Sequence, residues 1–340
     1  MSAATGILNK GLGRTVDEAN RATLNETLDF IPSLSVLSVS DLPHGLSPAT
    51  SARLVRSLTV AGVFALPTRH AIVLNTFAGL NPDIDAELAS LFRNHLPIGP
   101  FNLLNNDTMV NYNNGDYECL SWLNRHGPAT VTYISFGTMM APGRSGADLW
   151  GCHSMHMTTP RQYEYVVEMS DLEELAHGLE AVGVPFLWSL KGEARDGLPP
   201  GFLDRTKGRG LTVAWAPQVR VLAHAAVGAF LTHCGWNSVM EGITSAVPMV
   251  CRPFFGEQKA NARMVAEGWR IGVAIDSEGV AMREKVVNAL KMVLREEEGG
   301  RMRERLGEIK KQAEKAVGDG GSSRENFRRV LEVICGDLDG

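Results

Sequence analysis

A short turn in the second half of the chain gathers side chains that can donate hydrogen bonds to an anion. HCGWNS (233–238) contains His233, Asn237 and Ser238, and it follows the apolar run VGAFLT (227–232). A helical pattern comes next, so these donors would lie at a helix N-terminus. Unpaired N–H groups and the helix dipole favour negative charge there. The turn is therefore a candidate anion-binding site.

The same turn has a second interpretation that needs no ligand. Ser238 and Glu241 have the Ser-x-x-Glu spacing of a capping box, in which the two side chains satisfy the free N–H groups of a helix start. Small polar residues are common at such positions. From this motif alone, both interpretations stay open.

Other positions nearby supply groups that complement an anion site. Trp215 follows the apolar run 211–214 and enters a proline-bearing turn that would hold its indole for stacking on a base, although an isolated Trp is more often a core residue. Glu241 can accept hydrogen bonds from a ribose diol, and Glu257 with Gln258 can bind adjacent sugar hydroxyls. Taken together, these groups outline a nucleotide sugar.

Buried parallel strands would position these groups. Short apolar, β-branched runs that end in turn residues alternate with helical patterns, which predicts an α/β fold. Ligands of open α/β sheets sit beyond the carboxyl ends of the strands. We predict strands at 33–39, 71–77, 130–138, 185–190, 211–214, 227–232, 247–251 and 271–275.

Composition excludes several classes of partner. The 340 residues carry a formal net charge of -5 and scattered basic residues, which gives no footprint for nucleic acid or an anionic membrane. No apolar run approaches the ~18 residues of a membrane span, and the N-terminus lacks the pattern of a signal peptide. The five cysteines are odd in number and never form CxxC, which favours a reducing compartment. We expect a cytoplasmic protein without a membrane span, and a monomer.

Composition along the chain suggests three parts. The polar segment 105–115 has the character of a linker, so we place a boundary between a first part at 1–115 and a second part at 116–320. The second part contains an insertion at about 140–169. Residues 321–340 form a third part with a helical pattern.

Residues 215–258 resemble the signature box of plant UDP-sugar glycosyltransferases, and the motifs LNTF, IGPFN, YISFGT and CRPFFGEQ resemble flavonoid or anthocyanidin 3-O-glucosyltransferases. The resemblance implies a GT-B fold of two Rossmann-like domains, here with an incomplete N-terminal domain and a complete C-terminal one. It implies that 1–115 is a partial acceptor-binding domain, that 116–320 is the UDP-sugar donor-binding domain, and that 321–340 is a C-terminal helix packing back on the first domain. It also implies inverting O-glycosyl transfer from UDP-glucose, a co-substrate, without cofactor or metal. The implied acceptor is a small phenol such as a flavonol or anthocyanidin.

Roles at the nucleoside end are carried over from the family to the matching positions. The resemblance implies that Trp215 stacks on uracil, while Ala216 and Gln218 help to hold the base through the turn. It implies that Glu241 binds the ribose.

Roles at the diphosphate and the sugar follow in the same way. The diphosphate would contact Thr138, His233, Asn237 and Ser238. The transferred sugar would contact Trp236, Glu257 and Gln258. Gln258 as the last residue of the box resembles glucose users, since galactose users tend to carry His.

The chain departs from the family at its start. The family's catalytic His follows its first strand and is supported by an Asp, but nothing before Leu28 resembles that segment, so we expect on the order of 130 to 150 residues, or several strand–helix units, to be missing. His44, His70 and His95 are interpreted as solvated loop residues, and the catalytic residues stay unknown. The alternative function is therefore a truncated, non-catalytic UDP-sugar-binding fragment.

The insertion at about 140–169 is the second departure. Cys152, His153 and His156 lie within it, but no second ligand pair at zinc-site spacing accompanies them. We expect no metal site, and a loop that is either disordered or mis-spliced.

Overall fold

The computed structural model describes residues 27–28, 34–42, 71–92, 94–104, 117–137, 169–254, 256–275 and 281–336. The chain divides into two compact units. Unit 1 comprises 1–113 and 307–340, and unit 2 comprises 114–306. The second break falls inside one helix, whereas the sequence-based division keeps 116–320 together, and those domain bounds stay a prediction.

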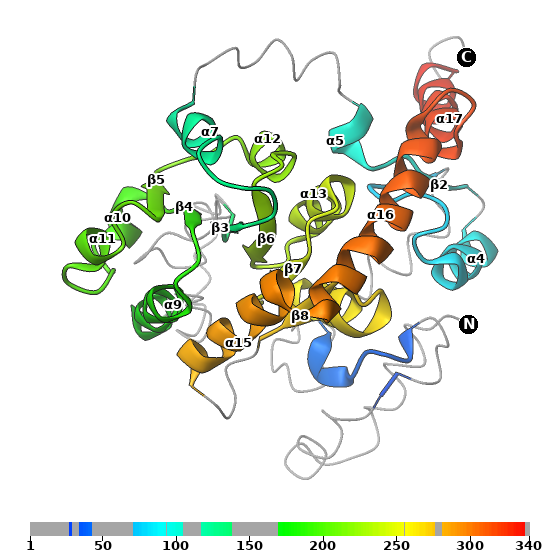
Figure 1. Ribbon diagram of the computed structural model, residues 1–340. Coiled ribbons are helices and arrows are strands. Elements are labelled where there is room, and N and C mark those ends of the chain that lie inside the picture. The colour runs from blue at the N-terminus through cyan, green and yellow to red at the C-terminus, as the bar shows by residue number, and fades with distance from the viewer. Residues whose placement is uncertain are drawn as a thin grey trace, which may run out of the picture. The chain divides into compact units, whose positions relative to one another are not determined.

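Unit 2 is built on a six-stranded parallel sheet (Figure 1) with the order β5-β4-β3-β6-β7-β8. The order reverses between β3 and β6, as in doubly wound Rossmann-like folds. The predicted α/β fold is confirmed, and all six strands predicted here are present. Their bounds are β3 Val131–Ser135, β4 Phe186–Ser189, β5 Gly210–Val213, β6 Val227–Thr232, β7 Met249–Cys251 and β8 Gly272–Ala274.

The two central strands are buried at every position, as their unbroken apolar and β-branched sequences predict. The rings of Tyr133 on β3 and Phe230 on β6 stack with centroids 5.3 Å apart. Gly228 permits a close approach at the start of β6, because a Cβ there would lie 2.2 Å from the carbonyl oxygen of Ala129. These contacts fix the two strands between which the sheet order reverses.

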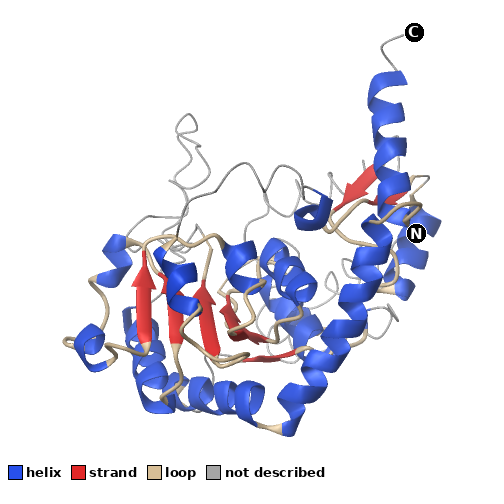
Figure 2. Cartoon of the chain, turned by 45° about the horizontal axis from the view of Figure 1, so that its top comes forward, coloured by secondary structure: helices blue, strands red, loops and turns tan. Residues whose placement is uncertain are grey.

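Helices flank this sheet (Figure 2). α9 and α15 pack against each other so closely that a Cβ on Gly178 of α9 would lie 3.0 Å from Val286 of α15. Together with the sheet they enclose a core that includes Leu175, Leu179 and Leu290. The helical segments of this unit are α7 Glu118–Leu123, α9 Met169–Val182, α10 Gly192–Arg195, α11 Phe202–Arg205, α12 Gln218–Leu222, α13 Trp236–Ser245, α14 Gln258–Arg263, the π-helical turn η4 Met264–Gly268 and α15 Met282–Arg295.

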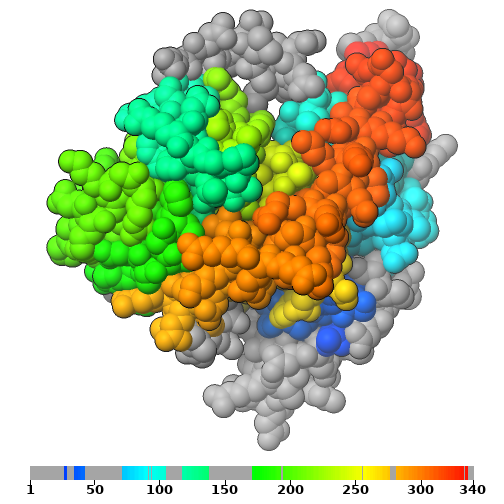
Figure 3. All heavy atoms as spheres, in the orientation of Figure 1, coloured from blue at the N-terminus to red at the C-terminus, as the bar shows by residue number. Residues whose placement is uncertain are grey.

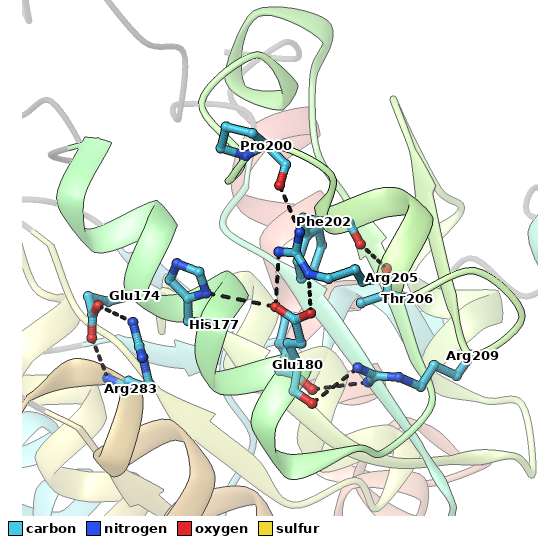
Figure 4. A network of polar contacts seen from close by, with 10 residues as sticks. Glu174, His177, Glu180, Pro200, Phe202, Arg205, Thr206, Arg209 and Arg283 are labelled. Atoms are coloured by element: carbon cyan, nitrogen blue, oxygen red, sulfur yellow. Dashed lines mark hydrogen bonds and ion pairs between the residues drawn. The ribbon is translucent and has the colours of Figure 1, made fainter.

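A polar network fastens α9 to its neighbours (Figure 4). The Glu180 carboxylate accepts hydrogen bonds from Arg205 Nε at 2.5 Å and Nη2 at 3.2 Å, and His177 Nδ1 lies 3.8 Å from it. The Arg205 guanidinium lowers the pKa of Glu180. Arg209 donates to the backbone carbonyl of the same glutamate, and Arg283 of α15 pairs with Glu174 at 2.9 Å. These contacts lie on the outer surface of α9.

Unit 1 contains two parallel strands, β1 Ile72–Leu74 and β2 His95–Pro97, with α4 Pro82–Leu91 between them and α5 Phe101–Leu104 after them. α16 Glu297–Val317 enters it from unit 2 and is followed by α17 Ser322–Gly336. Asn326 of α17 donates to the Pro97 carbonyl at 2.9 Å, so this C-terminal helix lies against β2 (Figure 3).

One strand predicted in unit 1 is wrong. Residues 34–42 form turns and the 3-10 helix η2 Val39–Asp41 in place of a strand at 33–39, and a single bridge joins Ser38 to Thr27. The segment 95–102 contains β2 and the start of α5 although it carries two prolines. Within the described ranges, no helix combines the length and apolarity needed to span a membrane.

Candidate functional site

The predicted site residues collect at one edge of the sheet in unit 2. All its strands are parallel, so their carboxyl ends meet there. Ten of the predicted residues follow β5, β6 or β7: Trp215, Ala216, Gln218, His233, Trp236, Asn237, Ser238, Glu241, Glu257 and Gln258. Thr138, which follows β3 in the sequence, lies outside the described residues.

Trp215 presents its indole to solvent at the end of β5. Its side chain is 58% exposed, so the interpretation of this residue as part of the core is wrong. The Tyr117 ring supports it at a centroid distance of 5.8 Å and an angle of 54°, and the Arg220 guanidinium lies 5.6 Å from the centre of the Tyr117 ring. Ala216 is buried beneath the turn. An exposed, supported aromatic face is suited to stacking on a base.

The turn after β6 is held in an unusual backbone conformation. Cys234 has a φ of 61°, which is rare for a residue with a side chain. Its N–H donates to Thr232 Oγ1 at 3.2 Å, and its carbonyl accepts from the Asn261 side-chain amide at 2.9 Å. Because Asn261 lies on α14 and is 8% exposed, a buried polar contact from another helix fixes the turn that precedes α13.

Two glycines enclose the His233 imidazole. A Cβ on Gly137 would lie 3.0 Å from Cε1, and a Cβ on Gly235 would lie 2.4 Å from Nε2. Burial lowers the pKa of His233 to about 4, although a hydrogen bond with the Ser135 backbone opposes the shift. The imidazole is therefore neutral at pH 7. Its Nδ1 is buried without a hydrogen-bond partner among the described residues. Buried polar atoms are normally hydrogen-bonded, so Nδ1 is a candidate contact for a ligand.

The structure contradicts the capping-box interpretation of Ser238 and Glu241. Gly235 is the N-cap of α13, and Ser238 is already the third helical residue. No side-chain cap hydrogen bond forms at this helix start in the part of the chain that the structure describes. The first N–H groups of α13 therefore remain directed at the edge of the sheet, next to Asn237, which is exposed.

Ser238 and Glu241 instead share one donor, the side-chain amide of Gln218 at the start of α12. Gln218 Nε2 donates to Ser238 Oγ at 3.0 Å and to Glu241 Oε2 at 2.6 Å. Tyr133 completes the cluster, because its hydroxyl donates to Gln218 Oε1 at 3.3 Å. Burial raises the pKa of Glu241, and the Gln218 hydrogen bond partly offsets that rise. The cluster joins β3, α12 and α13 beside the turn that follows β6.

Two of the three predicted sugar-binding residues, Glu257 and Gln258, follow β7, and Trp236 follows β6. Glu257 is exposed, whereas Gln258 is 4% exposed and its Oε1 accepts the Phe254 N–H at 2.8 Å. That bond gives Gln258 a structural role in closing its own loop, and a contact with sugar stays a prediction. Trp236 packs beside Trp269 with centroids 6.4 Å apart.

Sequence patterns did not identify the residues that brace this loop. Arg252 directly follows β7, pairs with Asp171 of α9, and lies 4.9 Å from the ring centre of Phe254. Phe254 meets Phe136, which follows β3, edge to face at 5.4 Å. The residue that braces the neighbouring turn after β6 is Asn261. Its spacing of i, i+3 from Gln258 was a signal in the sequence, because the two residues give α14 a buried polar face.

Of the remaining candidates, only His95 lies within the described residues. The interpretation of His95 as a solvated loop residue is wrong, because it begins β2 and its side chain is only 6% exposed. Its Nε2 lies 3.9 Å from Asp85 Oδ1. His44, His70 and the group Cys152, His153 and His156 lie outside the described residues. Across the residues that are described, no cluster of three His, Cys, Asp or Glu side chains could hold a metal.

Comparisons with known proteins identify relatives of this chain. The family model described as "UDP-glucoronosyl and UDP-glucosyl transferase" matches residues 164–313. Myricetin 3-O-rhamnosyltransferase UGT77B2 of Crocosmia x crocosmiiflora is 50% identical over 94% of this chain, which spans 64% of that relative's length. Anthocyanidin 3-O-glucosyltransferase 7 of Manihot esculenta is 40% identical over 91% of this chain and 97% of its own length.

A solved structure shares the fold as well. The crystal structure of UDP-glucose: anthocyanidin 3-O-glucosyltransferase in complex with UDP matches with a TM-score of 0.79 and 32% identity, over 98% of this chain and 67% of that one. This similarity confirms a fold of the GT-B type. Together with the sequence relatives, it shows that the chain belongs to the UDP-glycosyltransferase family.

Proposed function

We propose that this chain binds UDP-glucose at the edge of the unit 2 sheet. We propose that it acts as an inverting O-glycosyltransferase on a flavonoid- or anthocyanidin-like hydroxyl. The observation that carries the proposal is the supported, exposed indole of Trp215 on the same sheet edge as the open N-terminus of α13. A planar base and a diphosphate need those two features.

The chemistry of the remaining groups fits the other parts of the donor. In the tautomer protonated at Nδ1, neutral His233 can donate its single N–H to a phosphate oxygen without placing a buried positive charge at the site. Glu241 supplies a carboxylate for the ribose diol, and Glu257 with Gln258 follow β7 at the sugar end. The donor needs no metal or cofactor in this scheme.

The identity of the sugar and of the acceptor belongs to the same proposal. Gln258 supports glucose as the transferred sugar, although the Crocosmia relative is named for rhamnose. The names of the relatives support a phenolic acceptor such as a flavonol or anthocyanidin. We further propose a monomeric, cytoplasmic protein.

Calorimetric titration of the purified chain tests donor binding. UDP-glucose should bind, whereas GDP-glucose, which carries the same sugar on a purine nucleotide, should bind more weakly. UDP-galactose and UDP-rhamnose then rank the sugars, and tighter binding of either would replace glucose in the proposal. Failure to bind any UDP compound would overturn it.

A transfer assay with flavonols and anthocyanidins tests the reaction. Inverting transfer requires a base to take the acceptor proton, a contribution typically worth ~10² to 10⁴-fold in rate. Glucosylated product supports the transferase. Donor binding without any product would leave a UDP-sugar-binding fragment, the alternative function.

Replacing Glu241 with Gln keeps the size of the side chain and removes its charge. We expect UDP affinity to fall by about 1 to 3 kcal/mol if the carboxylate holds the ribose. An unchanged UDP affinity in the calorimetric titration would show that Glu241 does not hold the ribose.

A further inference from the structure

One buried tyrosine touches the donor site without reaching its surface. Tyr133 is 1% exposed in β3, and its hydroxyl donates to Gln218 Oε1 at 3.3 Å. The other end of the same amide donates to Ser238 and Glu241 at 3.0 and 2.6 Å. A single amide therefore connects a core strand to two residues of the donor site.

The phenol holds this amide from the side opposite Glu241. Burial raises the pKa of Tyr133, an effect that the Ser135 and Ser189 hydroxyls only partly oppose, so its O–H remains a donor. The Glu241 carboxylate only accepts, so Nε2 of Gln218 faces it and Oε1 accepts from the phenol. In the flipped amide, two acceptors would meet at Glu241, and the phenol O–H would lose its acceptor.

Amide orientation in turn determines how Glu241 is presented. The hydrogen bond from Gln218 holds Oε2, and Oε1 is the second acceptor of the same carboxylate. A ribose diol needs a carboxylate oxygen in a fixed position, and a pre-oriented acceptor loses less rotational freedom on binding.

We propose that Tyr133 is a positioning residue for the ribose: its hydroxyl orients the Gln218 amide, which aims Glu241 at the diol. This inference rests on the proposed function, since it concerns how the same site holds UDP. Tyr133 itself touches neither nucleotide nor sugar in this scheme.

The test compares UDP with 2′-deoxy-UDP by calorimetry in wild type and Tyr133→Phe. Wild type should prefer UDP, because one diol hydroxyl is missing from the analogue. The variant should lose roughly 3- to 10-fold in UDP affinity, about the value of one hydrogen bond, and less in 2′-deoxy-UDP affinity, so that the preference shrinks. Equal losses for both ligands, or none, would overturn the inference.

Phe230→Leu is the matched control. It removes the ring that stacks on Tyr133 and retains the hydroxyl, so stability should fall while the preference for UDP persists. Gln218→Leu gives a second route, because it removes the amide and should also shrink the preference.

The outcomes separate the two proposals. Wild-type chain that binds neither nucleotide would overturn the proposed function together with this inference. Wild type that prefers UDP, alongside a Tyr133→Phe variant with the same preference, would overturn the inference alone.

Discussion

The guanidinium of Arg252, just after β7, pairs with the carboxylate of Asp171 in the first turn of α9. The Arg252 side chain is 8% exposed, and its Nε is buried without a partner among the described residues. The pair therefore holds a buried charge beside the loop that carries Glu257 and Gln258.

Breaking this pair should cost far more stability than breaking a surface pair. We expect Asp171→Asn to lower the free energy of unfolding by about 3 kcal/mol, because it leaves a buried guanidinium without its counter-charge. Glu180→Gln, which breaks the more exposed pair with Arg205, is the control and should cost less than about 1 kcal/mol. Urea unfolding of both variants measures the difference, and similar small losses would contradict the role of the pair.

The neutral His233 makes stability depend on pH. Its folded pKa of about 4 lies below the unfolded value, so its contribution is present above pH 6.5 and is lost as the pH falls toward 4. As the pH falls from 7 to 4.5, the difference in protonation of His233 between the folded and unfolded states should lower the free energy of unfolding by about 2 kcal/mol. Unfolding at both pH values should show a smaller acid loss in His233→Gln, and an equal loss in variant and wild type would refute the assignment.

Trp215 should matter for binding and little for folding. Trp215→Ala removes an aromatic face from the base, which is worth ~1 to 3 kcal/mol in stacking, while its exposed side chain adds little to the core. Trp188→Phe, at a fully buried position in β4, should have the opposite effect: it should lower stability without weakening UDP binding. Calorimetry and thermal unfolding of the two variants decide between these effects.

Gly235 should not accept even a methyl group. In Gly235→Ala the new Cβ would meet His233 Nε2 at 2.4 Å, so the imidazole must move, and we expect UDP affinity to fall about tenfold or more, or ~1.4 kcal/mol. Gly300→Ala is matched in chemistry but opens into free space within α16, and it should raise stability by roughly 0.5 to 1 kcal/mol. Normal UDP binding by Gly235→Ala would show that the imidazole is not confined.

The sheet of unit 2 could be predicted from the sequence because its buried parallel strands are uninterrupted apolar runs. The start of α13 could not. Ser-x-x-Glu has the same local pattern whether Ser caps the helix or lies inside it, and the distant Asn261 helps to decide between them by fixing Cys234.

Unit 1 shows the same limit in its strands. Pro97 can end β2 because it pairs at the last position of a short ladder, and its carbonyl is satisfied by Asn326, far along the chain. Conversely, the apolar run 33–39 finds only an isolated bridge at Ser38, and a strand needs a partner of matching length. Neither partner is visible in a local window of sequence.

The parallel ladder of β3 and β4 has a consequence for the long stretch that separates β3 from α9. The ladder brings Ser135 beside Ser189 whatever the length of the intervening chain. Loop-closure entropy grows only logarithmically, so doubling that length costs about 0.6 kcal/mol. Halving the length of the stretch should therefore gain little in folding free energy, and the sheet can close around connections of different length.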